Sequence, residues 1–249
     1  MDKRLEDYLL PEYQAVIPMM YITPTVVNDG RRMVISPHGV SFMMTAPIGV
    51  VQPDAVEIDA VDFGRLLGDQ GAGNLRLLTA LRMNASYPYV LPTAHLPTRP
   101  GIELMDAGFR DNYGLLSAAR FIQVFHEWIL DNTSGVVLVQ INTSEKIEEI
   151  GPSDQKGVIT SLFNPLDVAG PLLSLQEFEQ DASIGFVFDL LGAERFQVIR
   201  FLYRPAQGAK VPAAISFHLS RGEKRSVLLA WNLPENRAAV EALGRALQA

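Results

Sequence analysis

The sequence predicts an α/β protein with a mainly parallel sheet flanked by helices. Residues 102–105 have the apolar character of a short buried strand, and residues 114–130 place apolar side chains at spacings of three and four, as the buried face of a helix does. Residues 135–141 are almost all apolar, which is typical of a strand inside a parallel sheet. Because strand, helix and strand follow one another, we expect a right-handed β-α-β unit.

The residues before this unit predict a helix, a strand and a hairpin. Residues 2–10 have a helical pattern that Pro11 would close, and residues 16–22 form an apolar run that we expect to be a buried strand. Residues 28–30, Asn-Asp-Gly, tolerate positive φ and separate two apolar runs, so they predict a hairpin turn.

Two further helices are expected before the β-α-β unit. The first is a short helix over residues 60–68. Asn74 is placed to cap the second. The apolar face of this second helix would consist of Leu75, Leu77, Leu78 and Leu81.

The chain after the unit is expected to contain helices over residues 172–191, 220–230 and 235–248 and a strand over 196–203. Residues 144–169 hold Gly, Pro, Ser and several charges, a composition typical of a connection. We therefore predict one α/β domain over residues 1–249, in which residues 145–249 form a C-terminal extension of helices and a strand.

Composition excludes several classes of function. The net charge is −7 and the basic residues are scattered, which argues against a nucleic-acid-binding face. There is no cysteine, and the four histidines have no metal-ligand spacing, so we expect neither a metal site nor a cofactor. No apolar run reaches membrane-spanning length. The charged first residues are unlike a signal peptide, so a cytoplasmic location is expected if Met1 is the natural start.

The most informative segment is residues 105–114, MDAGFRDNYG. It places Asp106 where the predicted strand 102–105 ends, at the edge where open α/β sheets bind ligands. Ala107 and Gly108 then let the backbone turn sharply. A carboxylate on such a corner is suited to act as a general base, although a turn-forming Asp that binds its own backbone has the same pattern.

Residues 80–92, ALRMNASYPYVLP, followed by Asp106-Ala107-Gly108, resemble the patatin-like phospholipase family. In that family a helix with small residues and a Pro-aromatic segment precedes the Asp-Gly-Gly/Ala loop of the catalytic aspartate. Asn112 and Gly114 match the polar and turn positions that follow. The resemblance covers residues 17–142 and is sharp from 80 to 114. It implies a three-layer α/β fold and a catalytic role for Asp106, with Ala107, Gly108 and Asn112 in its supporting loop.

The family's nucleophile has no clear counterpart here. Patatin-like enzymes pair their aspartate with a serine on a G-x-S-x-G elbow, and the nearest segment is Gly39-Val40-Ser41-Phe42-Met43. Met43 stands where the elbow needs a small residue, so Ser41 is a weak nucleophile candidate. The family's Gly-rich oxyanion loop is also absent. The resemblance thus implies the C-terminal portion of a patatin-like domain, without its oxyanion-loop and elbow region.

Other candidates have a simpler structural interpretation. His38 lies close to Ser36 and Gly39, where a loop histidine of no special role is the commoner case. Asp111 could pair with Asp106 as the two carboxylates of a glycosidase, but an Asx-type turn leading into the helix near Gly114 is the commoner use of such a residue.

We therefore expect this chain to be part of a lipid acyl hydrolase that uses a Ser-Asp dyad. The chain by itself is expected to be inactive. Its substrate in the intact enzyme would be a lipid or another ester. A homodimer or a separately encoded N-terminal half would be its partner. The alternative is a non-catalytic lipid-binding or protein-interaction module on the same scaffold.

Overall fold

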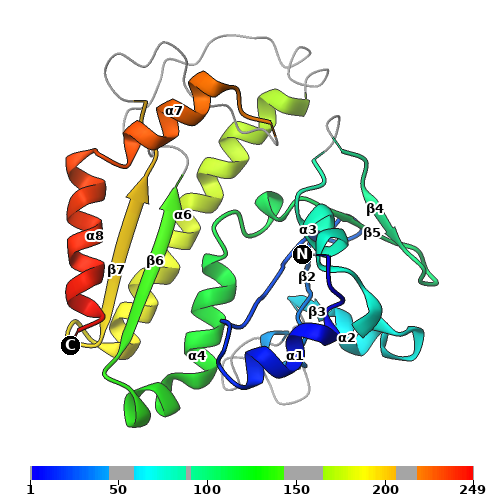
Figure 1. The fold of residues 1–249 in the computed structure, drawn as a ribbon. Coiled ribbons are helices and arrows are strands. Elements are labelled where there is room, and N and C mark those ends of the chain that lie inside the picture. Colours follow the sequence, from blue (N-terminus) through cyan, green and yellow to red (C-terminus); the bar gives the residue numbers. More distant parts are fainter. Residues whose placement is uncertain (1, 45–58, 88–90, 143–164, 206–217, 249) are drawn as a thin grey trace. The chain divides into compact units, whose positions relative to one another are not determined.

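The structure is a computed structural model that describes residues 2–44, 59–87, 91–142, 165–205 and 218–248 (Figure 1). The chain divides into two compact units. The first consists of Met1–Val124 and Asn164–Ser183, and the second of Phe125–Phe163 and Ile184–Ala249. The predicted single domain over 1–249 stays a prediction. The α/β class is confirmed, since helices accompany a sheet in each unit.

The first unit is built on a five-stranded sheet with the order β3-β2-β1-β5-β4. Only β2 and β3 pair in parallel, and the other neighbours are antiparallel, so the sheet is mixed. Its strands are β1 (Thr25–Val26), β2 (Arg32–Val34), β3 (Ala60–Asp62), β4 (Ala94–Leu96) and β5 (Ile102–Met105). The predicted hairpin is confirmed: β1 and β2 are antiparallel, and Gly30 adopts a φ of 77° in the turn between them.

The helices of the first unit are mostly short. They are α1 (Glu6–Tyr13), α2 (Phe63–Leu66), α3 (Leu77–Asn84) and the 3-10 turns η1 (Ser41–Met43), η2 (Gly68–Gln70), η3 (Ala72–Asn74) and η4 (Ala107–Phe109). Two long helices, α4 (Leu115–Asn132) and α6 (Pro165–Leu191), contribute residues to both units. Both were predicted, and on α4 the buried positions Leu115, Ile122 and Ile129 belong to the expected apolar stripe.

The core of the first unit lies against the five-stranded sheet. Met33 and Ile35 on and beside β2 and Leu104 on β5 are fully buried. Ala80 and Met83 of α3 join the same cluster. These side chains give the sheet a rigid backing, and the end of β5 is therefore a fixed point from which the 106–111 turn begins.

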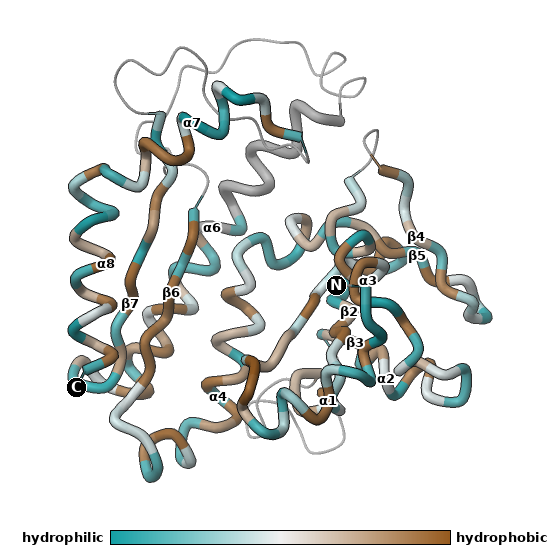
Figure 2. Tube along the Cα trace, viewed as in Figure 1, coloured by the Kyte–Doolittle hydropathy of each residue, from teal (hydrophilic) through white to brown (hydrophobic). Residues whose placement is uncertain are grey.

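The second unit contains a two-stranded parallel sheet of β6 (Val136–Asn142) and β7 (Phe196–Leu202), paired from Val136↔Phe196 to Asn142↔Leu202. Figure 2 shows largely hydrophobic residues along β6. Helices α7 (Arg221–Ala230) and α8 (Pro234–Ala246) complete the unit. The buried Asn236 side chain ties α8 to β7, since its amide donates to the Leu202 carbonyl and accepts from the Leu202 N–H.

Two of the local predictions are wrong, and a third is confirmed only in part. Residues 16–22 form no strand among the described elements: Val16 is 72% exposed, and only Ile22 makes a bridge, with Ile35. Pro11 lies inside α1 instead of closing it, and the helix continues to Tyr13. The predicted helix over 60–68 begins as the strand β3, since Ala60–Asp62 pairs with β2 before α2 starts.

The predicted cap of α3 is also wrong, and its predicted apolar face is confirmed only at Leu75 and Leu77, which pack against the core. Arg76 occupies the N-cap, and Asn74 instead accepts a hydrogen bond from Arg4. Leu78 and Leu81 are exposed, because the helix turns its small Ala80 toward the core. Ala80 and Met83 are the buried positions of this helix, and both belong to the core cluster.

The predicted β-α-β unit does not form. Strands β5 and β6 belong to different sheets, and β5 pairs antiparallel with β1 and β4. The nearly all-apolar β6 is therefore no interior strand of a large parallel sheet. Its Val139 and Ile141 are exposed while Gln140 is buried.

Candidate active site

Asp106 is held at the carboxyl end of β5, where the sequence placed it. Its backbone N–H donates to the Ser86 carbonyl at 2.9 Å, and its own carbonyl accepts from the Thr25 hydroxyl at 2.9 Å. Ser86 and Thr25 are both buried. The backbone of Asp106 is therefore fixed on two sides, which leaves its side chain as the variable part of the site.

The Asp106 carboxylate has little compensation for its burial. Its Oδ1 accepts the backbone N–H of Gly108 at 2.6 Å. Burial raises the pKa of the Asp106 carboxyl above its usual range, and the Gly108 hydrogen bond opposes that rise only in part. A half-buried carboxylate with a raised pKa is a better proton acceptor than an ordinary aspartate.

The supporting loop explains why a glycine follows. A Cβ on Gly108 would lie 2.7 Å from Asp106 Oδ1 and 3.1 Å from Asn112 Oδ1. The structure thus brings Asp106, Gly108 and Asn112 together, as the sequence predicted, while the side chain of Ala107 is buried. Phe109 packs its ring on Tyr87, with the centroids 5.5 Å apart, and its carbonyl accepts a hydrogen bond from the Gln176 side chain of α6.

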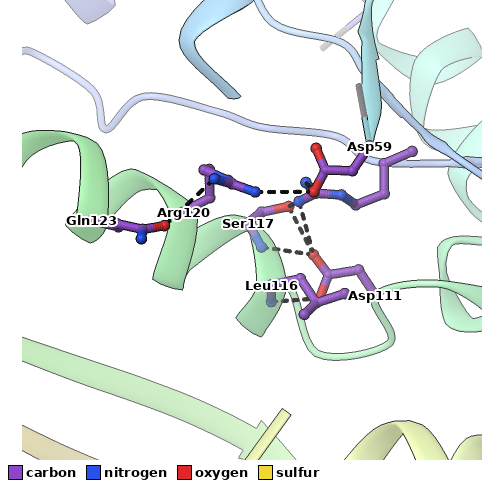
Figure 3. A network of polar contacts seen from close by, with 7 residues as sticks. Asp59, Asp111, Leu116, Ser117, Arg120 and Gln123 are labelled. Carbon is purple, nitrogen blue, oxygen red and sulfur yellow. Dashed lines mark hydrogen bonds and ion pairs between the residues drawn. The ribbon is translucent and has the colours of Figure 1, made fainter. Parts of the chain in front are cut away.

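The far end of the turn carries a second carboxylate, Asp111, which Figure 3 shows against the start of α4. Its Oδ1 accepts the Leu116 N–H at 3.0 Å. Its Oδ2 accepts both the N–H and the hydroxyl of Ser117, at 3.0 and 2.7 Å. Asp111 therefore caps α4, and its carboxylate points at the helix N-terminus and not toward a glycosidase-like partner.

Ser41 is not brought to Asp106 by any contact among the described residues. It begins the 3-10 turn η1, and its exposed hydroxyl donates to Asp62 Oδ2 at 3.0 Å. Asp62 is 2% exposed and also accepts the backbone N–H groups of Val40 and Arg65. The Asp62 carboxylate, which accepts the Ser41 hydrogen bond, therefore has a structural role as the N-cap of α2.

His38 has a partner that sequence reasoning missed. Its Nε2 lies 3.1 Å from Oε2 of Glu12, whose side chain is fully buried. Burial raises the pKa of Glu12, and the nearby His38 opposes this rise. The two residues lie in separate segments with no shared motif, so nothing in the sequence signalled the pair. No contact among the described residues links it to Asp106.

The described part of the chain contains no group of three or more histidine or acidic side chains that could hold a metal ion. Its helices include none that is both long and apolar enough to cross a bilayer. Comparison with protein-family models, with curated proteins and with solved structures found no match to this chain. The function is therefore inferred from the geometry of the 106–111 turn.

Proposed function

We propose that this chain is the aspartate-bearing part of a patatin-like acyl hydrolase that uses a Ser-Asp dyad. The observation that supports the proposal is the state of Asp106, whose backbone is fixed at the end of β5 and whose carboxyl has a raised pKa. A general base needs both a fixed position and a pKa closer to the working pH than that of an ordinary aspartate.

In the proposed reaction Asp106 accepts the proton of a serine hydroxyl as the serine oxygen attacks an ester carbonyl. The tetrahedral intermediate then expels the alcohol, which takes the proton back from Asp106. Water attacks the resulting acyl-serine in the same way, with Asp106 again accepting and returning the proton. The substrate class is a carboxylic ester, with a lipid ester as the physiological form.

The nucleophile in this proposal comes from outside the residues that resemble the family. Ser41 is an unsuitable source, because its hydroxyl is engaged by Asp62 and it begins a 3-10 turn that does not directly follow a strand. An elbow requires a tight strand-to-helix turn. By itself this chain is then expected to lack esterase activity, and a preceding segment or a separately encoded half would supply the nucleophile.

A second candidate function is a non-catalytic module that binds lipid or protein. The exposed apolar residues at and after α1 favour it, since Leu10, Tyr13 and Val16 are 60%, 82% and 72% exposed. Neighbouring exposed apolar side chains of this size are typical of contact surfaces. In this case Asp106 would have only a structural role.

The test compares this chain with the entire reading frame that encodes it, using a fluorophosphonate probe read by intact mass and hydrolysis of p-nitrophenyl butyrate. We expect one labelled serine and ester turnover in the product that carries a G-x-S-x-G elbow, and neither in residues 1–249 alone. Asp106→Asn should lower kcat by about 10²–10⁴-fold without removing the fold.

Two results would overturn the proposal. If no protein encoded with or beside this chain gives a labelled serine that depends on Asp106, the acyl hydrolase is ruled out in favour of the binding module. If residues 1–249 alone are labelled at one serine, the idea of a missing nucleophile is wrong.

A further inference from the structure

The capping carboxylate of the turn is connected to the sheet through a buried arginine. Arg32, the first residue of β2, is 1% exposed, and its Nη1 donates to the Ser117 hydroxyl at 2.9 Å. The same hydroxyl donates to Asp111 Oδ2 at 2.7 Å. The Ser117 hydroxyl therefore bridges the two charged groups with one hydrogen bond to each, and Arg32 Nη1 lies 4.0 Å from Asp111 Oδ2.

The other end of the guanidinium is held by a second carboxylate. Arg32 Nη2 donates to Asp59 Oδ2 at 3.1 Å, and Arg120 of α4 donates to the same oxygen at 3.2 Å. The ion pairs thus balance two arginines against two aspartates. Nε of Arg32 has no partner among the described residues, so its head group depends on Ser117 and Asp59 for its hydrogen bonds.

This arrangement fixes both ends of the 106–111 turn. The Asp106 end is tied to Ser86 and Thr25, and the Asp111 end is tied to α4 and, through Ser117, to Arg32 on β2. Because β2 and β5 flank β1 in one sheet, both ends of the 106–111 turn are attached to the same sheet. A turn fixed at both ends has little freedom to rotate the carboxylate that it carries.

We propose that Arg32, Ser117 and Asp111 are positioning residues. They hold the 106–111 turn in its observed conformation and thereby keep the Asp106 carboxylate in its buried orientation. They act through the turn and touch no reacting atom. The consequence for catalysis rests on the proposed role of Asp106 as the base, whereas the positioning itself is a property of this chain alone.

A purely structural network would stabilise α4 and leave Asp106 unchanged. A positioning network predicts more, because releasing the Asp111 end lets water reach Asp106. The pKa of Asp106 should then fall toward its ordinary value, since burial is what raises it. The Gly108 N–H, which donates to Asp106 Oδ1, should also exchange its hydrogen faster.

The experiment uses residues 1–249 without substrate and follows the Asp106 carboxyl by ¹³C NMR titration and the Gly108 amide by hydrogen exchange. Ser117→Ala removes the bridging hydroxyl while both backbone caps of α4 remain, and Arg32→Lys keeps the charge but cannot reach both partners. The control is Ser183→Ala, whose hydroxyl donates to the carbonyl of Glu179 on its own helix.

We expect Gly108 exchange to rise about tenfold and the pKa of Asp106 to fall in both variants, with wild-type values in the control. Wild-type values in both variants would overturn the proposal, even if each variant is less stable. If Arg32→Lys does not fold, Ser117→Ala decides alone. Neither measurement requires esterase activity. The test of the positioning residues therefore remains valid even if the proposed function is wrong.

Discussion

The 106–111 turn has an aspartate at each end, and the two carboxylates differ in their burial and in the number of hydrogen bonds that they accept. Asp111 is buried and accepts three hydrogen bonds, from Leu116 and from both polar groups of Ser117. Asp106 is half-buried and accepts one from Gly108, and burial raises its pKa. A carboxylate with several donors is a structural anchor, whereas one that is desolvated with little compensation can still take up a proton.

The free-energy cost of burial is also offset to different degrees for the two carboxylates. Hydrogen bonds and the Arg32 charge offset the burial of Asp111, so removal of one partner leaves the other charge buried and unpaired. Much of the burial of Asp106 is not offset, and a titratable group with such uncompensated desolvation is typical of functional sites.

Arg32→Met should lower the free energy of unfolding by about 3–5 kcal/mol, because it leaves the buried Asp111 with no cation beside it. The matched control is the neighbouring Arg31→Met, where a surface ion pair to Asp29 with an N···O distance of 2.6 Å should be worth about 0–1 kcal/mol. Urea denaturation of both variants measures the difference. Equal losses at the two positions would mean that the Arg32 network contributes nothing special.

Gly108→Ala should cost about 1–3 kcal/mol, because its Cβ would lie 2.7 Å from Asp106 Oδ1 and force the carboxylate to move. Gly101→Ala is the control, since nothing lies within 4 Å of a Cβ there, and its effect should stay within about 0.5 kcal/mol. Thermal unfolding measures both. A neutral Gly108→Ala would show that Asp106 tolerates another orientation.

Ser41→Ala should cost about 0.5–1.5 kcal/mol, because it removes one of the donors to the buried Asp62. The Asp106 titration should not change, since no contact among the described residues links the two sites. Denaturant unfolding and ¹³C NMR titration of the Asp106 carboxyl test the two parts separately. A shift of the Asp106 pKa in this variant would place Ser41 in the active site and contradict its assignment to Asp62.

Asp106→Asn should have the smallest effect and the opposite sign. At neutral pH the wild-type carboxylate is charged and poorly solvated in the folded state, so the neutral amide should be slightly more stable. Because the folded pKa is raised above 3.8, wild-type stability improves as pH falls through the folded value toward 3.8, and the advantage of the variant disappears there. Melting temperatures of both proteins from about pH 3 to pH 8 test this prediction.

Short stretches of sequence are sufficient to predict several local features of this chain. Asn28 to Gly30 predicted the hairpin, because that turn depends on residues that accept positive φ. The spacing of apolar residues predicted α4 and its buried stripe. The position of Asp106 after β5, with Gly108 close behind it, followed from a short strand and a turn signal within ten residues.

Long-range packing sets which segments of the chain come into contact. Arg32 and Ser117 are 85 residues apart, and their hydrogen bond has no trace in local pattern. The assignment of Ser41 to Asp62, and the pairing of β5 with β1 and β4 in place of β6, also depend on long-range packing. The spacing of apolar residues indicates which face of a helix or strand is apolar, but it does not indicate which other apolar face packs against it. The choice among them is set by shape, by hydrogen-bond satisfaction and by charge in the assembled core.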